Sequence, residues 1–250
     1  MNAERTLLLP LEGDLPDAHL RALAARVARL RDAALDGVLV VSPQTMQAAS
    51  LPLAVEVEHL TSNERLLQRP AIERAMARRE REVQLFLAEC SHQHALSVRC
   101  SRHLGDIADV VVARPGADVL LLPRLAHSAL PRIARKAGHL EELVLYCDAG
   151  AGDFLQAVLP LVQRLCAERG VEQITLLHEG SVANAADDLL SLRLPLRRWL
   201  VNTRDAQWVR RLHLGAGSLL LLPLGVPGTS GAPAVVRLLR HARSPVLLLQ

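Results

Sequence analysis

The sequence predicts an α/β fold made of two tandem parallel-sheet units with helices on both faces. Short apolar runs alternate along the chain with longer stretches whose apolar residues recur at helical spacing. The apolar runs contain few polar residues, which is typical of parallel strands covered on both faces. The order of these segments in the first half recurs in the second half. Such alternation predicts parallel strands joined by right-handed crossovers.

The first half begins with a predicted strand at 6–11, followed by a helix from Pro16 and a second strand at 37–41. Residues 42–69 follow no period and contain Pro43 and Pro52, so we expect a connection with one helical turn. The remaining elements alternate between helix and strand. They are a helix at 72–94, a strand at 96–102, a helix at 106–112, a strand at 118–122 and a helix at 127–137.

The second half opens with the stretch 143–152, in which an apolar run ends in Asp148 and a loop of small residues. This pattern predicts a buried strand at 142–147, a tight turn and a helix at 154–169. A glycine-bearing loop at 225–231 separates the later elements. The predicted strands are 173–177, 196–201, 218–222 and 245–249, and the predicted helices are 182–190, 205–214 and 233–242.

The two halves match segment by segment. Leu7–Leu9 corresponds to Leu143–Leu145, and Val38–Val41 corresponds to Ile174–Leu177. The apolar stripes of the first helices also correspond, one position out of step with the strands. Leu20, Leu23, Val27 and Leu30 match Leu155, Val158, Val162 and Leu165. We therefore divide the chain into a first unit, 1–140, and a second unit, 141–250.

The composition excludes several classes of protein. Of the 250 residues, 50% are hydrophobic and 2% aromatic, so aliphatic side chains must fill a sizeable core. The formal charge of +3 is scattered, which argues against nucleic-acid binding. The apolar runs are too short for membrane insertion. The four cysteines form no CxxC pair and no secretory signal is recognisable, so we expect reduced thiols in a cytoplasmic protein.

The pattern resembles the universal stress protein family. An acid, Asp148, closes the first strand of the second unit, and Gly225-Val-Pro-Gly228 follows its fourth strand. The closing segment Arg240-His-Ala-Arg-Ser-Pro-Val-Leu-Leu-Leu249 is similar to the helix-to-strand ending common in that family, with Ser244 where the family has cysteine. The resemblance covers nearly the whole chain as two tandem copies, an arrangement that the family also shows.

The resemblance implies an ATP site in the second unit. Asp148 would meet the adenosine, and the backbone at Leu177 and His178 would meet the base. The phosphates would lie on the loop formed by Gly225, Gly228, Thr229, Ser230 and Gly231. Glycines let the backbone approach a ligand closely, and exposed N–H groups at a helix start attract anions.

This sequence departs from the family's Gly-x2-Gly-x9-Gly-Ser/Thr pattern. Only Thr229, Ser230 and Gly231 separate Gly228 from the predicted helix, so the nine-residue spacer is missing. In the first unit Glu12 is a weaker counterpart of Asp148. The segment Pro123–His127, which corresponds to the glycine loop, contains no glycine. We therefore expect no ATP site in the first unit. That unit also lacks a fifth strand of its own, because residues 142–147 begin the second unit.

Each signal also has a structural interpretation. Asp148 fits a helix N-cap, and the loop at 225–231 fits a turn chosen for its geometry. Cys90, His92 and His94 could bind zinc together with Cys100 and His103, but no standard ligand spacing is matched, and we assign no metal site. Trp199 and Trp208 fit core or interface positions better than ligand stacking.

The sequence contains no recognisable catalytic set, so we do not expect an enzyme. We expect a stress-linked regulatory protein whose ligand is ATP or a related adenine nucleotide, with a protein partner or self-association. The alternative is a scaffold that binds no nucleotide and acts only by protein association. An enzyme on the related adenine-nucleotide-hydrolase fold is a third interpretation, and the absence of catalytic acids and lysines disfavours it.

Overall fold

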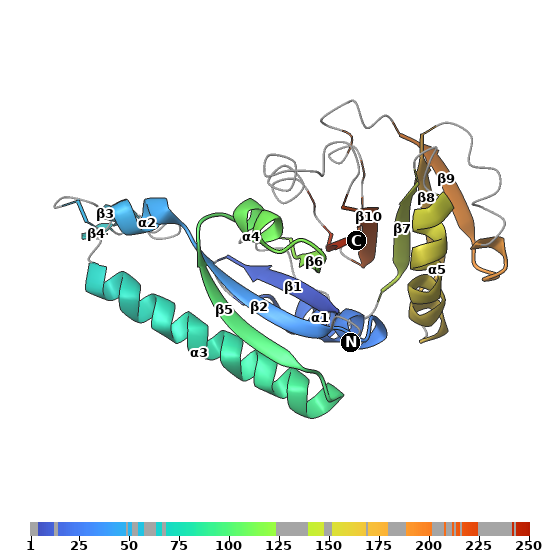
Figure 1. The fold of residues 1–250 in the computed structure, drawn as a ribbon. Helices are drawn as coiled ribbons and strands as arrows, with labels where there is room; N and C mark the ends of the chain where they lie inside the picture. Colours follow the sequence, from blue (N-terminus) through green and yellow to red (C-terminus); the bar gives the residue numbers. More distant parts are fainter. Residues whose placement is uncertain are drawn as a thin grey trace.

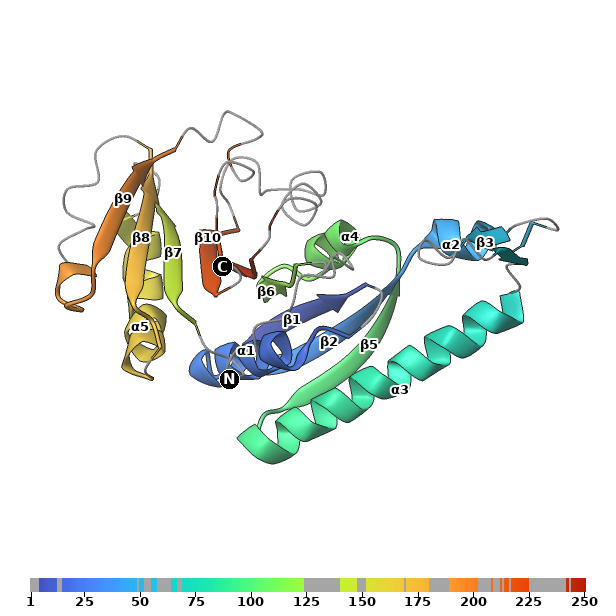
Figure 2. The same ribbon diagram turned by 180° about the vertical axis from the view of Figure 1, so that it is seen from behind.

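The structure is a computed structural model of the 250-residue chain. It describes residues 5–12, 15–48, 50–51, 55–57, 64–66, 69–123, 140–147, 152–168, 170–179, 189–201, 208, 212, 214–215, 217–224, 242 and 244–250. The predicted α/β class is confirmed, because a nine-stranded, mostly parallel sheet carries helices on both faces (Figures 1 and 2).

The first half contributes four strands to this sheet, together with a small two-stranded hairpin. The strands are β1 (Thr6–Leu11), β2 (Ala34–Val41), β5 (Val98–Leu104) and β6 (Asp118–Leu121), and the hairpin pairs β3 (Val55–Val57) with β4 (Glu64–Leu66). The helices are α1 (Ala18–Leu30), α2 (Pro43–Ala48), α3 (Arg69–His94) and α4 (Ile107–Ala113).

The second half contributes five strands and the described helix α5 (Gly152–Ala167). The strands are β7 (Glu142–Cys147), β8 (Gln173–His178), β9 (Leu196–Leu200), β10 (Ser218–Pro223) and β11 (Val246–Leu249). The predicted helix at 127–137, and most of the predicted helices at 182–190, 205–214 and 233–242, lie outside the described residues.

The sheet order is β5-β2-β1-β6-β11-β10-β7-β8-β9. Within each half the neighbouring strands are parallel, as predicted. The halves meet where β6 pairs with β11 in the antiparallel direction, with Leu120 opposite Leu247. The fifth strand of the second half therefore occupies the position beside β6 that a fifth strand of the first half would take.

One face of the sheet is covered by α1, α3 and α5. Their buried residues join strand residues of both halves in one continuous apolar cluster, in which Leu23 of α1, Phe86 of α3 and Val162 of α5 are almost fully buried. The other face carries α4 and Trp208, packed against Val38, Tyr146 and neighbouring strand residues. Aliphatic side chains thus fill both layers, as the scarcity of aromatic residues requires.

Local sequence signals explain where the helices begin. The Asp17 carboxylate accepts a hydrogen bond from the Leu20 N–H at 2.9 Å and caps α1. Asp106 and Asp109 form a reciprocal capping box at the start of α4, with N···O distances of 3.0 and 2.9 Å. Pro70 is tolerated in α3 because it lies in the first turn, where its missing N–H has no helical acceptor.

The structure corrects the predicted start of β2 and the predicted connection that follows this strand. β2 begins at Ala34, three residues before the predicted start, and includes the buried acid Asp36, whose charge masked the strand pattern. In the segment 42–69, α2 corresponds to the predicted helical turn, and the β3–β4 hairpin was not predicted. Three-residue strands are too short to show a recognisable period in the sequence.

Candidate ligand-binding edge of the sheet

The order of strands reverses between β7 and β10 in the second half. The crossover from β7 leads to β8 on one side, while β10 pairs with β7 on the other side. Leu145 is opposite Leu221, so the carboxyl ends of β7 and β10 lie side by side. In open α/β sheets ligands bind outside the carboxyl ends of the strands at such a switch point. This edge is therefore the candidate ligand site.

Most of the residues predicted for the site lie outside the described residues. These are Asp148, Gly225, Gly228, Thr229, Ser230 and Gly231. The described strands end immediately before both segments: β7 ends at Cys147, and β10 ends at Pro223. The topology therefore makes neighbours of the strands from which the predicted acid and the predicted glycine loop continue.

Leu177 and His178, the two described residues of the predicted site, end β8. The Leu177 side chain is fully buried. His178 is half-buried, and its carbonyl accepts a hydrogen bond from the Val201 N–H at 2.9 Å. On the other side of β8, the Glu179 N–H donates to the Cys147 carbonyl at 3.3 Å. The backbone at this edge is thus already tied into the sheet on both sides of β8.

A small aromatic cluster lies beneath the same edge. The rings of Tyr146 and Trp208 have centroids 5.7 Å apart and are tilted by 36°. Tyr146 is fully buried, and Trp208 is almost so. Leu177 belongs to the same apolar cluster. The residues beneath the candidate site are therefore buried and mainly apolar, and the fluorescence of Trp208 can report on changes there.

The opposite, amino-terminal edge of the sheet carries acids that are bound internally. The Glu142 carboxylate accepts hydrogen bonds from Gln173 Nε2 at 2.7 Å, Thr175 Oγ1 at 2.6 Å and Ser218 Oγ at 2.7 Å. Thr175 and Ser218 are buried. This carboxylate thus links the starts of β7, β8 and β10 by hydrogen bonds, and its role is structural.

Two buried acids lie in the first half. Asp36 of β2 pairs with the Arg114 guanidinium and accepts from Ser101 Oγ at 3.2 Å. Asp118, at the start of β6, accepts from Arg31 Nε at 2.8 Å and from the backbone N–H of Gln250 at 3.1 Å. Sequence reasoning missed both acids, although a lone acid inside an apolar run was a usable signal.

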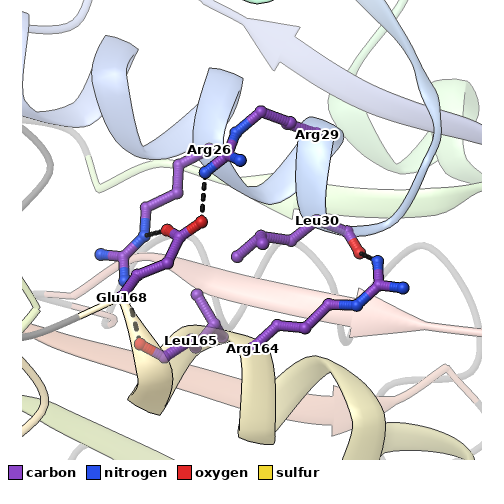
Figure 3. Close-up of polar contacts among 6 residues, drawn as sticks. All are labelled: Arg26, Arg29, Leu30, Arg164, Leu165 and Glu168. Carbon is purple, nitrogen blue, oxygen red and sulfur yellow. Dashed lines mark hydrogen bonds and ion pairs between the residues drawn. The ribbon is translucent and has the colours of Figure 1, made fainter.

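The two halves are also joined by polar contacts between α1 and α5 (Figure 3). Arg26 Nη2 of α1 donates to the Leu165 carbonyl of α5 at 3.0 Å. In the other direction, Arg164 Nη1 of α5 donates to the Leu30 carbonyl of α1 at 2.8 Å. Each arginine therefore satisfies a carbonyl in the last turn of the opposite helix, where a cation is also favoured by the helix dipole.

The corresponding edge of the first half differs. Glu12 follows β1. Leu122 and Pro123 follow β6, and neither of these two described residues is a glycine. Glu12 is half-buried and takes part in a further polar interaction.

The cysteines and histidines considered for zinc are separated in the structure. Cys90 is buried in α3, His92 and His94 are exposed at the end of that helix, and Cys100 is exposed on β5. Among the described residues, no group of three or more His, Cys, Asp or Glu side chains is arranged to hold a metal ion. Burial raises the pKa of the Cys90 thiol to about 11, and nearby Glu89 adds to this effect.

No protein-family model matches the chain, and no curated protein matches it. Among the solved structures that are similar to the chain are two with 12% sequence identity. One is described as a protein from the universal stress protein family from Burkholderia pseudomallei; the match covers 77% of this chain and 94% of that chain, with a TM-score of 0.26. The other is described as HlmI and is matched over 81% of this chain and 64% of its own length, with a TM-score of 0.18. At these TM-scores the assignment of the fold rests on the sheet topology alone.

No helix within the described part of the chain is long and apolar enough to cross a membrane.

Proposed function

We propose that the chain is a tandem protein of the universal stress type, in which the second unit binds ATP or a related adenine nucleotide at the β7–β10 edge. The observation that carries this proposal is the switch point between these two strands. The predicted acid Asp148 and the predicted loop 225–231 continue from those strands. In this proposal the protein acts as a stress-linked regulator without catalysis, in the cytoplasm.

Two features support the division into units 1–140 and 141–250. The strand order β5-β2-β1-β6 has the same pattern as β9-β8-β7-β10. Leu30 and Leu165 occupy matching positions in the two halves of the sequence. The backbone carbonyl of each accepts a hydrogen bond from an arginine of the opposite helix. A chain with two copies of one unit would produce such a reciprocal interface, as two-fold related subunits do.

Calorimetric titration with ATP tests the proposal. Binding should be lost in Gly228→Val, because a side chain there would keep a phosphate away from the loop backbone. Gly215→Val is the matched control, since Gly215 precedes β10, and among the described residues an added Cβ would meet Ser218 Oγ at 3.8 Å and the Gly217 nitrogen at 4.0 Å. Unchanged ATP affinity in Gly228→Val with an unchanged circular dichroism spectrum would refute the loop assignment.

Trp208 provides an independent readout. The chain has only two tryptophans, so Trp199→Phe isolates the emission of Trp208 beneath the proposed site. ATP should change this emission in a saturable way, and the midpoint should agree with calorimetry. A protein that shows neither heat nor a fluorescence change would favour the scaffold without nucleotide. The supporting observation for the scaffold is that β9 ends the sheet within the described residues and carries exposed Trp199 and Leu200.

A further inference from the structure

The outer edge of β9 has an identifiable set of backbone groups. Within the described residues β9 is the last strand of the sheet and pairs only with β8. The Val201 N–H donates to the His178 carbonyl at 2.9 Å, and the Pro195 carbonyl accepts from the Ile174 N–H at 2.9 Å. Backbone groups alternate in direction along a strand. Odd-numbered residues from 195 to 201 therefore direct their backbone groups toward β8.

The even-numbered residues of β9 direct theirs outward. These are Leu196, Arg198 and Leu200, and no backbone hydrogen bond of these three residues occurs in the described part of the chain. Their N–H and C=O groups form a row with the spacing that an added strand requires. The edge can therefore accept a further strand without any change in the existing ladder.

The side chains around this edge combine positive charge with exposed apolar surface. Residues 189–201 include Arg193, Arg197 and Arg198 and no acidic residue. Arg197 and Arg198 are exposed and fall on opposite faces of the strand. Beside them, Trp199 is 39% exposed and Leu200 is 73% exposed. Figures 1 and 2 show β9 at the side of the sheet away from α3, which lies against the other edge strand, β5.

We propose that the β9 edge binds an extended acidic segment of a partner protein, which adds to the sheet as a tenth strand. The backbone row would supply sequence-independent hydrogen bonds. Two adjacent acids in the segment would pair with Arg197 on one face and Arg198 on the other. Apolar residues beside the acids would cover Trp199 and Leu200. The partner is therefore defined as a segment with two neighbouring acids flanked by β-branched or other apolar residues.

The same charges disfavour a second copy of this chain as the occupant. Full overlap of two antiparallel β9 edges would place Arg198 directly opposite Arg198 of the other copy. Like charges in directly opposed cross-strand positions are destabilising. A self-associated edge would leave this repulsion uncompensated, whereas an acidic segment replaces it with attraction. Arg197 and Arg198 thus favour acidic partners and disfavour edge-to-edge aggregation of this chain.

Fluorescence anisotropy with synthetic peptides tests the proposal on the full-length chain. The probe is a labelled peptide with two adjacent glutamates between pairs of valines, and the control peptide has two lysines in place of the glutamates. We expect saturable binding of the glutamate peptide, at least tenfold stronger than binding of the lysine peptide. The affinity should fall as salt is raised, because the attraction is between exposed charges.

Four variants separate binding at this site from non-specific attraction to a basic protein. Arg198→Glu should lower the affinity for the glutamate peptide by about tenfold or more. Arg74→Glu, at an exposed position of α3, changes the net charge equally and should leave this affinity unchanged. Leu200→Pro removes an outward N–H and should block the edge while the protein stays folded. Val201→Pro is its contrast, because it removes the hydrogen bond to His178 and should lower thermal stability.

N-methylated peptides supply a signature specific to strand addition. Two glutamate peptides are N-methylated at alternate residues, in opposite registers. Only the peptide that leaves its edge-facing N–H groups intact should bind. Equal binding of both peptides, equal binding of the lysine control or full affinity in Arg198→Glu would overturn the proposal. A dimer in analytical ultracentrifugation that Leu200→Pro abolishes would also overturn it. None of these readouts depends on nucleotide, so failure of the ATP experiments remains distinguishable.

Discussion

Arg26 of α1 and Glu168, which follows α5, form an ion pair across the two halves of the chain, with Nε and Oε2 2.7 Å apart (Figure 3). Arg29 binds the other oxygen of the same carboxylate. Burial alone would raise the pKa of Glu168, but the hydrogen bonds and charges of the two arginines together lower it below its usual value. The contact therefore stabilises the ionised form of Glu168 in the folded protein.

Glu168→Gln should lower the free energy of unfolding by about 1–2 kcal/mol at pH 7, because a partly buried, charge-assisted contact is lost. A lowered folded-state pKa means that this stabilisation is present above about pH 4.3, the unfolded value, and is lost as the pH falls through the lowered one. Urea unfolding at a series of pH values should show the difference between the two proteins shrinking in acid. Glu73→Gln is the control, because it removes the exposed ion pair of Glu73 with Arg69 on α3. It should change the free energy of unfolding little at any pH.

Gly37 of β2 lies directly under α3. An added Cβ would come within 3.0 Å of Leu87 Cδ1 and 3.3 Å of Val83 Cγ1. Gly37→Ala should therefore destabilise the protein by about 1–3 kcal/mol through overpacking. In a double-mutant cycle, Leu87→Ala should relieve part of this cost, so the two changes together should cost less than the sum of each alone. Strict additivity would show that the cost of Gly37→Ala does not come from its contact with Leu87.

The ion pair of buried Asp36 with partly exposed Arg114 predicts an asymmetric response. Arg114→Met leaves the nearly buried Asp36 carboxylate with Ser101 as its remaining partner among the described residues and should cost about 1–3 kcal/mol, since Arg114 is partly screened by solvent. Asp36→Leu combined with Arg114→Met removes both charges and should recover much of that loss. Chemical denaturation of the single and double variants measures both values. A double variant less stable than Arg114→Met would contradict this account of the pair.

Adjacent glutamates at the start of β7 offer a matched comparison. Glu142→Ala removes the acceptor of three hydrogen bonds and leaves the buried hydroxyls of Thr175 and Ser218 without it, so we expect a loss of about 2–4 kcal/mol. Glu141→Ala makes the same change in charge one residue earlier, at an exposed side chain, and should cost less than about 0.5 kcal/mol. Equal unfolding midpoints for both variants would argue against the internal role of Glu142.

Thiol alkylation should distinguish the four cysteines in the native state. Cys100 is exposed, whereas Cys90 and Cys147 are buried and Cys166 is half-buried. Burial, followed by the charges of Glu80 and Asp36, raises the pKa of the Cys100 thiol, so its reaction with iodoacetamide should accelerate as the pH rises above 9. Cys100→Ser should remove the fastest phase, and the remaining thiols should react mainly after unfolding. A fast phase that persists in this variant would contradict the assignment.

Much of the fold could be predicted because apolar periodicity dominates it. The strands at 6–11, 142–147 and 218–222 were located to within a residue, since each is an uninterrupted apolar run. The alternation of strands and helices also predicted the parallel direction of neighbouring strands within each half. The antiparallel pairing of β6 with β11 could not be predicted, because it depends on how two halves dock and on no local pattern.

The candidate site was predicted less completely. Sequence reasoning identified the strand ends that form the switch point, because an acid and a glycine loop follow them. It did not identify Asp36, Asp118 or Glu142 as internally paired acids, since their partners are distant in sequence. It also did not identify the β9 edge, because Trp199 and Leu200 look like core residues until burial is measured. Exposure is a property of the assembled sheet.

The seam between β6 and β11 has a consequence for synthesis on the ribosome. β6 ends at Leu121, and its partner strand begins at Val246. At about 5–20 residues per second, roughly 6–25 s separate the emergence of these two segments. During that interval the nascent first half presents β6 as an open strand edge, which is a template for pairing with neighbouring nascent chains. Translation speed over the second half thus becomes a determinant of yield, and slowing it should increase the demand for chaperones.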